Sequence, residues 1–312
     1  MRFAVIGVGG AGGYFGARLA EAGHDVTFIA RGEHLAAIRK SGLRIDSVNG
    51  DVVVSSAKAT DDPREVGVVD YVLMGVQAWQ VPEAARAAAA LVGPTTAVLP
   101  LQNGVEAPEQ IAEALGREHA LGGTAKIISF RVGPGHIKHA GAEPTLEIGE
   151  LDGARSARVE ALRQAFAQAK GVTVTIPADI RVATWAKFLF ITSWAGVGAV
   201  TRAPLGVIRS VPETRRLLET AMQEIERVAR ANAIRLPAGV VAATMTFVDS
   251  LPAQGTSSMQ RDLIAGKPSE LESLSGAVTR LGAEVAVPTP TNAFLYHALL
   301  PLERRARGQL AF

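Results

Sequence analysis

The 312-residue chain contains no cysteine. It therefore cannot form disulfides, use a thiol nucleophile or bind zinc through thiolates, and it fits a reducing compartment such as the cytoplasm. Aromatic residues make up only 5% and charged residues 20% of the chain, whereas hydrophobic residues make up 48%. This balance is typical of a globular protein and not of a disordered one.

An excess of charge of one sign is also absent. The formal net charge is only +2, and no basic run is interleaved with aromatic residues, so nucleic-acid binding is not indicated. The N-terminus has no charged segment ahead of an apolar core, so no signal peptide is predicted. Residues 183–200 are strongly apolar but contain Lys187, Gly196 and Gly198. We therefore expect a buried core helix there and no membrane span. No metal site is expected in the chain.

The first thirty residues carry the most informative pattern. Residues 3–6 form a short apolar run, and Gly7, Gly9 and Gly12 follow at the G-x-G-x-x-G spacing. A helical stretch comes next, and residues 25–30 form a second apolar run. A glycine turn that follows a strand and opens a helix within a βαβ unit predicts dinucleotide binding. The alternative is a βαβ turn of another α/β fold.

Each residue of this turn has a physical role in that interpretation. Gly7 allows the tight turn, Gly9 lets a pyrophosphate approach the backbone, and Gly12 lets helix and strand pack closely. Gly10 and Ala11 lie at the start of the helix, where free N–H groups and a partial positive charge attract phosphate.

The end of the second strand indicates which dinucleotide binds. An NAD site usually carries an acid there, which accepts hydrogen bonds from the ribose 2′-OH, but this strand ends in Ile29-Ala30-Arg31. A guanidinium binds a 2′-phosphate through two parallel hydrogen bonds. Arg31 therefore favours NADP(H), the alternative being a solvated loop arginine.

Strands and helices alternate in the first half, which predicts a doubly wound, mostly parallel Rossmann sheet. Strands are expected at residues 43–45, 52–55, 68–76, 97–101 and 172–176, and helices at 33–40, 82–91, 107–115 and 157–169. Further strands at 124–130, 136–139 and 145–148 suggest an antiparallel extension of that sheet. Only helices are expected afterwards, at 181–190, 213–231, 238–250, 270–281 and 292–306. The predicted domains are an α/β cofactor domain, 1–178, and an all-helical domain, 179–312.

A dinucleotide domain followed by a helical domain suggests a reductase with its site in the cleft between them. Reduction of a carbonyl requires a proton donor for the oxygen. Lys187 lies among Trp185, Phe188 and Phe190, so we expect partial desolvation to lower its pKa and make it a better acid. The alternative is a lysine that extends its amine to solvent along an apolar helix.

A second stretch with catalytic potential runs from Thr256 to Asp262 and is followed by Gly266 to Glu270. Adjacent hydroxyls at a helix start can bind a carboxylate, and Glu270 could orient the lysine. The alternative is ordinary helix capping by serine, with a first-turn glutamate that favours the helix dipole.

Several motifs occur in order along the chain, namely the glycine turn, Arg31, Ala78-Trp79-Gln80, Asn103-Gly104, Trp185-x-Lys187, Ser257-Ser258-Met259 and Glu270. Together they resemble the ketopantoate reductase (2-dehydropantoate 2-reductase) family over essentially the whole chain. The resemblance implies NADPH-dependent reduction of a small 2-oxo acid to a 2-hydroxy acid by a Rossmann domain and an all-helical domain.

The resemblance also implies roles for individual residues. Lys187 would bind the keto oxygen and deliver the proton, and Asn103 would lie between the nicotinamide ribose and the substrate. Ser258 would hold the substrate carboxylate. Glu270 would contact substrate or cofactor and help to place Lys187.

The chain departs from the family pattern at the cofactor phosphate and in the substrate pocket. Gln77 stands where the family usually has a lysine that reaches the cofactor phosphate. Ile191, Ala195 and Leu205 stand where well-known members have asparagines, which predicts a less polar pocket. Two alternatives therefore stay open, namely a reductase of a less polar 2-oxo acid or imine, and a non-catalytic NADP(H)-sensing protein. Apolar helical surface allows a homodimer without requiring one.

Overall fold

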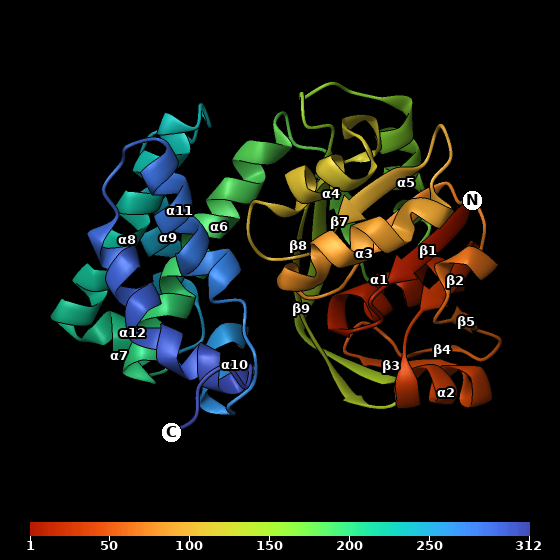
Figure 1. Ribbon diagram of the computed structural model, residues 1–312, viewed down its shortest axis with the longest axis horizontal. Helices are drawn as coiled ribbons and strands as arrows, with labels where there is room; N and C mark the ends of the chain where they lie inside the picture. The colour runs from red at the N-terminus through yellow and green to blue at the C-terminus, as the bar shows by residue number, and fades with distance from the viewer. The chain divides into compact units, whose positions relative to one another are not determined.

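The computed structural model describes all residues, 1–312, and the chain divides into two compact units (Figure 1). The first unit comprises Met1–Gln102 and Glu106–Ala183, and the second comprises Asn103–Val105 and Thr184–Phe312. The expected boundary at residue 178 lies in the turn between the last strand and the first long helix of the second half. The segment Asn103–Val105 packs with the second unit although it lies far upstream in sequence.

The first unit is built on a parallel sheet whose strand order is β5-β2-β1-β6-β7. All four neighbouring pairs are parallel, which confirms the predicted doubly wound sheet. The edge strand β5 was not predicted, because its sequence Lys58-Ala59-Thr60 contains no large apolar residue. The strands are β1 (Arg2–Ile6), β2 (Asp25–Ile29), β5 (Lys58–Thr60), β6 (Tyr71–Met74) and β7 (Ala97–Pro100).

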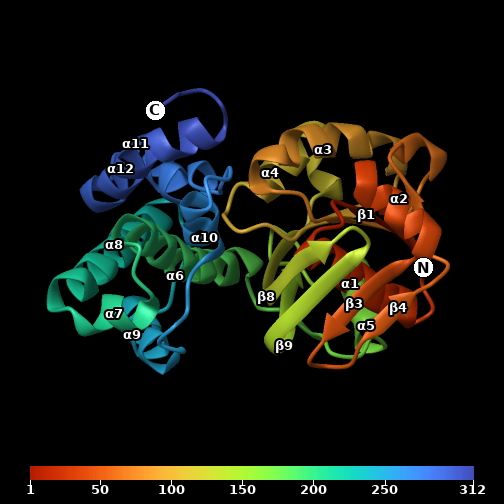
Figure 2. The same cartoon turned by 90° about the horizontal axis from the view of Figure 1, so that it is seen from below.

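A second sheet has the order β10-β9-β3-β4, with β8 paired to β9 (Figure 2). The expected hairpin around Asn49-Gly50 is confirmed by the antiparallel pairing of β3 and β4. The expectation that the later strands extend the first sheet was wrong, because β9 pairs in parallel with β3 and β10 instead. These strands are β3 (Leu43–Ser47), β4 (Val52–Val54), β8 (Gly122–Gly133), β9 (His136–Gly149) and β10 (Thr173–Thr175).

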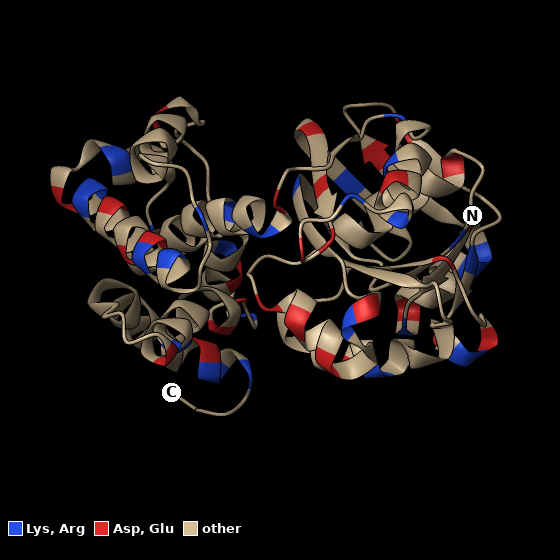
Figure 3. Ribbon diagram, turned by 90° about the horizontal axis from the view of Figure 1, so that it is seen from above, with Lys and Arg blue, Asp and Glu red and all other residues tan.

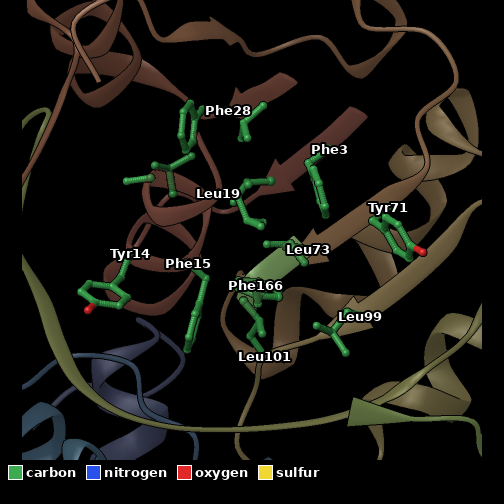
Figure 4. Close-up of a cluster of buried hydrophobic side chains, with 14 of the residues drawn as sticks. Phe3, Tyr14, Phe15, Leu19, Phe28, Tyr71, Leu73, Leu99, Leu101 and Phe166 are labelled. Carbon is green, nitrogen blue, oxygen red and sulfur yellow. The ribbon is translucent and has the colours of Figure 1, made fainter. Parts of the chain in front are cut away.

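Helix α1 packs against strands of both sheets and forms the centre of the first unit. Large apolar side chains of β1, β2, α1 and α5 are buried around it, and each contributes roughly 1.5–3 kcal/mol of stability. Figure 4 labels ten residues of this core: Phe3, Tyr14, Phe15, Leu19, Phe28, Tyr71, Leu73, Leu99, Leu101 and Phe166. The helices of this unit are α1 (Gly10–Glu21), α2 (Gly32–Ser41), α3 (Val81–Ala88), α4 (Ala107–Leu115) and α5 (Ala157–Ala167), with short 3-10 turns at η1 (Pro63–Glu65), η2 (Ala78–Gln80), η3 (Ala89–Leu91) and η4 (Arg117–His119).

The second unit contains only helices, as predicted. Helix α6 continues through Gly196 and Gly198 because both glycines pack closely against neighbouring side chains. A Cβ at Gly198 would lie 2.7 Å from the side-chain oxygen of Gln260. The elements are α6 (Ile180–Thr201), α7 (Leu205–Ser210), α8 (Pro212–Ala231), α9 (Val240–Ser250), α10 (Ser258–Ile264), the π-helix η5 (Glu272–Gly276), α11 (Ala277–Glu284) and α12 (Pro290–Ala306).

Two surface properties accompany this fold. None of the helices combines the length and the hydropathy that crossing a bilayer requires. Acidic and basic residues are interspersed along the helices of both units, in keeping with the small net charge (Figure 3).

Candidate functional site

The predicted cofactor residues of the first unit all follow the carboxyl end of a parallel strand. Gly7 follows β1, Arg31 comes soon after β2, and Gln77 comes soon after β6. Because β2, β1 and β6 are neighbours, these residues share one edge of the sheet. Ligands of open α/β sheets bind outside the carboxyl ends of the strands, and this edge is therefore the candidate cofactor site.

The glycine turn has the shape that a pyrophosphate requires. Gly7 has a φ of 89°, and a Cβ there would lie 2.5 Å from the backbone nitrogen of Val76. A Cβ on Gly12 would lie 2.2 Å from the carbonyl oxygen of Gly7. A Cβ on Gly9, in contrast, would meet only the Gly75 oxygen, at 4.0 Å, so open space lies above it. The turn is closely packed at Gly7 and Gly12 and open at Gly9, and its residues fit a dinucleotide phosphate.

The start of α1 is also packed closely against β8. A Cβ on Gly10 would lie 2.3 Å from the carbonyl oxygen of Ser129, so only glycine fits there. Ala11 is half-buried. A Cβ on Gly16, about one turn after Gly12, would lie 2.7 Å from Val5 of β1, so the close helix–strand contact extends along α1.

The buried His34 ties the glycine turn to a second part of the unit. Its Nε2 lies 2.8 Å from the Val8 carbonyl oxygen, and its Nδ1 accepts a hydrogen bond from the Gly135 N–H at 2.9 Å. Since Nδ1 is the acceptor, the proton of the neutral ring lies on Nε2 and is donated to Val8. Burial lowers the pKa of His34, which keeps the ring in this form. No sequence signal pointed to this residue.

Arg31 has an acidic neighbour that the sequence analysis missed. Its Nη2 lies 3.7 Å from Oε1 of Glu83, in the first turn of α3, and the side chains are 78% and 71% exposed. Gln77 is exposed at the start of η2. An incoming 2′-phosphate would therefore meet one guanidinium, one competing carboxylate and one neutral amide. The sequence did contain a signal for this neighbour, because Glu83 directly follows Pro82 at the start of a predicted helix.

In the second unit, Asn103 and Glu270 are brought together. Asn103 Nδ2 donates a hydrogen bond to Glu270 Oε2 at 2.9 Å, and Glu270 is 8% exposed. The turn that carries Asn103 fits closely, because a Cβ on Gly104 would lie 3.0 Å from the Ser273 carbonyl oxygen. Within the first unit, the preceding Gln102 donates to the carbonyl oxygens of Met74 and Val76 at 2.7 and 2.9 Å.

The other predicted catalytic and substrate residues belong to two helices of the same unit. Lys187 is half-buried on α6, near Trp185 and Phe188, whose rings meet edge to face at 5.5 Å. Ser258 is the exposed first residue of α10. The capping hydrogen bond comes from its neighbour Ser257, whose Oγ accepts from the Gln260 N–H at 3.1 Å.

The three apolar substitutions in the expected pocket differ in accessibility. Leu205 is 0% exposed at the start of α7, and Ala195 is also fully buried. Ile191 is half-buried and follows Lys187 by one helical turn. Of the three, Ile191 is therefore the position that can meet a ligand without rearrangement of the helical packing.

Comparison with known proteins supplies the family. Residues 3–153 match the family model "Ketopantoate reductase PanE/ApbA", and residues 179–303 match its C-terminal counterpart. The 2-dehydropantoate 2-reductase of Mesorhizobium japonicum is 31% identical, with 98% of this chain and 97% of that protein covered. The chain belongs to the ketopantoate reductase family. Its members are nicotinamide-dependent oxidoreductases of the class that acts on CH–OH groups, and their substrates are small 2-oxo acids.

Solved structures share the fold over the full length of the chain. The 2-dehydropantoate 2-reductase of Geobacter metallireducens matches with a TM-score of 0.89 and 30% identity, covering 96% of this chain and 99% of that one. A D-mandelate dehydrogenase, solved with NADH and anilino(oxo)acetate, matches with a TM-score of 0.88. It is 22% identical, over 98% of this chain and 99% of that one, and this likeness concerns the fold alone.

No cluster of three or more His, Asp or Glu side chains in the structure is arranged to hold a metal ion.

Proposed function

We propose that this protein is an NADPH-dependent reductase that converts a 2-oxo acid to a 2-hydroxy acid in the cytoplasm. The nominal reaction is 2-dehydropantoate to pantoate, a step of pantothenate biosynthesis. The observation that supports the proposal most is the hydrogen bond from Asn103 to Glu270. It joins two residues that lie far apart in the sequence and that both have expected roles in this reaction.

The proposed chemistry distributes simple tasks among the residues. NADPH, when bound, supplies the hydride. Lys187 would donate its proton to the keto oxygen as negative charge develops there. Ser258 would hold the substrate carboxylate. Glu270, together with Asn103, would hold the substrate in register with Lys187.

The glycine turn and the strand-end residues would hold the cofactor. Gly7, Gly9, Gly10, Ala11 and Gly12 would cradle the pyrophosphate at the start of α1. Arg31 would bind the 2′-phosphate, with Gln77 as a neutral hydrogen-bonding partner. The absence of an acid at the end of β2 supports NADPH over NADH. Glu83 near Arg31 makes the expected preference for NADPH smaller.

A less polar 2-oxo acid is a second candidate substrate, and the surroundings of Ile191 favour it. Phe190 and Trp194 flank this residue on α6 and stack with ring centroids 5.3 Å apart. Phe190 also contacts Phe247 of α9 edge to face, at 5.3 Å. The side chains of Ile191, Phe190 and Phe247 carry no hydrogen-bonding group, so they give no hydrogen bond to a substrate hydroxyl and discriminate weakly in favour of one.

The test is a panel of 2-oxo acids assayed with NADPH and with NADH, each ranked by kcat/KM. The panel should contain 2-dehydropantoate, its analogue without the hydroxyl group, and an aryl 2-oxo acid. The highest kcat/KM for 2-dehydropantoate with NADPH supports the nominal reaction. A higher kcat/KM for the analogue without the hydroxyl group or for the aryl 2-oxo acid favours the less polar substrate. Tight NADPH binding without oxidation by any 2-oxo acid would overturn the proposal in favour of a sensing protein.

A further inference from the structure

Helix α12 contains a buried carboxylate that the proposed reaction does not use. Glu303 is 4% exposed, and burial of a carboxylate is costly unless hydrogen bonds and an opposite charge compensate for it. Arg307, one turn later, supplies the charge through an Nε–Oε1 contact of 2.7 Å. The remaining donors all come from one residue, Ser269.

Ser269 is completely buried and gives both of its donors to Glu303. Its backbone N–H lies 3.1 Å from each carboxylate oxygen, and its hydroxyl donates to Oε2 at 2.6 Å. Arg307 donates to the Ser269 carbonyl oxygen at 3.1 Å. The Glu303–Arg307 pair thus holds the peptide groups on both sides of Ser269.

The second of these peptide groups leads directly into Glu270. Ser269 and Glu270 are the first buried residues after the exposed residues 264–268. Glu270 then accepts the hydrogen bond from Asn103, and its carbonyl oxygen accepts from the Leu274 N–H at 3.0 Å as the π-helix begins. The direction in which Glu270 leaves the backbone therefore depends on how Ser269 is fixed.

We propose that Glu303, paired with Arg307, is a positioning residue that fixes Ser269 and thereby orients Glu270 toward Asn103. The inference rests on the proposed function for its effect on turnover, because Glu270 is the residue through which it acts. The contact itself holds whatever the substrate is. The same geometry makes α12 a part of the proposed site, although no residue of α12 was a candidate from the sequence.

The chain offers a matched control for a merely structural role. Glu224 of α8 is also a fully buried carboxylate, and it holds the start of the same helix α12. It accepts from the Thr291 and Asn292 N–H groups at 2.8 and 2.9 Å and from Asn292 Nδ2 at 2.7 Å. Loss of the Glu224 carboxylate should destabilise the start of α12 and leave the hydrogen bonds between Ser269 and Glu303 in place.

The experiment compares Glu303→Gln and Glu224→Gln in the full-length protein, with Ser269→Ala as a milder second variant. Each is assayed for kcat with the best 2-oxo acid of the panel and for NADPH affinity. Backbone hydrogen exchange at 103–105 and 270–276 is measured well below the unfolding temperature. Both glutamine variants should unfold at lower temperature than the wild type, because each weakens a buried carboxylate network.

Of the two glutamine variants, only Glu303→Gln should lower kcat, by about tenfold or more, with the NADPH dissociation constant within about twofold of wild type. It should also accelerate exchange at 270–276, and Ser269→Ala should do both to a smaller degree. Glu224→Gln should keep kcat within about twofold and accelerate exchange at the start of α12 instead. Unchanged exchange at 270–276 in Glu303→Gln, or an equal loss of kcat in Glu224→Gln, would overturn the inference. If the wild type reduces no 2-oxo acid, the proposed function fails while the exchange pattern still decides the positioning role.

Discussion

The guanidinium of Arg31 and the carboxylate of Glu83 lie 3.7 Å apart on the surface of the first unit. The residue expected to select NADPH is thus partly neutralised by an acid from α3. A 2′-phosphate and the Glu83 carboxylate would compete for the same guanidinium. The preference for NADPH should therefore be smaller than Arg31 alone would provide.

Replacement Glu83→Gln should lower the NADPH dissociation constant by about three- to fivefold and leave that of NADH within about twofold. The effect should shrink at high salt, because exposed charges are screened. Fluorescence titration of the reduced nicotinamide measures both constants. Glu109→Gln is the matched control, since this exposed acid pairs with Arg117 at 2.9 Å in the same unit. Equal gains for both cofactors would refute the competition.

The open space above Gly9 predicts a variant that separates folding from cofactor binding. Gly9→Ala should keep the free energy of unfolding within about 0.5 kcal/mol of wild type, because the added Cβ meets no protein atom closer than 4.0 Å. It should raise the NADPH dissociation constant by about tenfold or more, because the methyl group occupies the phosphate path. Gly16→Ala should instead destabilise the protein, since its Cβ would lie 2.7 Å from Val5. Normal NADPH affinity in Gly9→Ala would place the pyrophosphate elsewhere.

The lowered pKa of the buried His34 leads to a prediction of how the stability of the protein depends on pH. Burial lowers its pKa from 6.5 in the folded state, and the same holds for the buried His139. The unfolded chain therefore binds more protons than the folded one as the pH falls through 6.5, and stability is lost in that direction.

In His34→Gln the amide can still donate to Val8 and accept from Gly135, but it does not titrate. The unfolding temperature of this variant should fall less steeply than that of the wild type between about pH 7.5 and about pH 5.5. Thermal unfolding followed by circular dichroism gives both curves. Parallel curves would show that His34 does not contribute to the acid sensitivity.

Ile191 predicts a change in substrate preference. Ile191→Asn should raise kcat/KM for 2-dehydropantoate relative to its analogue without the hydroxyl group by about three- to tenfold, because the amide can bind the hydroxyl. Ile191→Leu is the volume-matched apolar control and should leave the ratio unchanged. An unchanged ratio in Ile191→Asn would mean that this residue does not face the substrate.

The local parts of the fold could be predicted from the sequence because their signals are local. The glycine turn, the βαβ unit and the hairpin around Asn49-Gly50 each depend on neighbours in the chain. The second sheet could not be predicted, because β9 pairs in parallel with β3 about ninety residues upstream and strand composition does not choose a partner. The path of α6 through Gly196 and Gly198 also depends on tertiary packing.

The candidate site divides in the same way. Residues in motifs, such as Lys187 and Glu270, could be proposed from the sequence, and their roles stay predictions. The contacts that shape the site could not, because Glu83, His34 and Glu303 act on partners that are remote in sequence. A buried carboxylate such as Glu303 also looks like an ordinary i,i+4 partner of Arg307 on a helix surface until its burial is known.

The most direct test of the whole account is the steady-state rate of NADPH oxidation by wild type and Lys187→Ala with the best 2-oxo acid, together with the NADPH dissociation constant of each. The account predicts that kcat falls by about 10²- to 10⁴-fold while the dissociation constant stays within about twofold. Retained turnover in Lys187→Ala would contradict it.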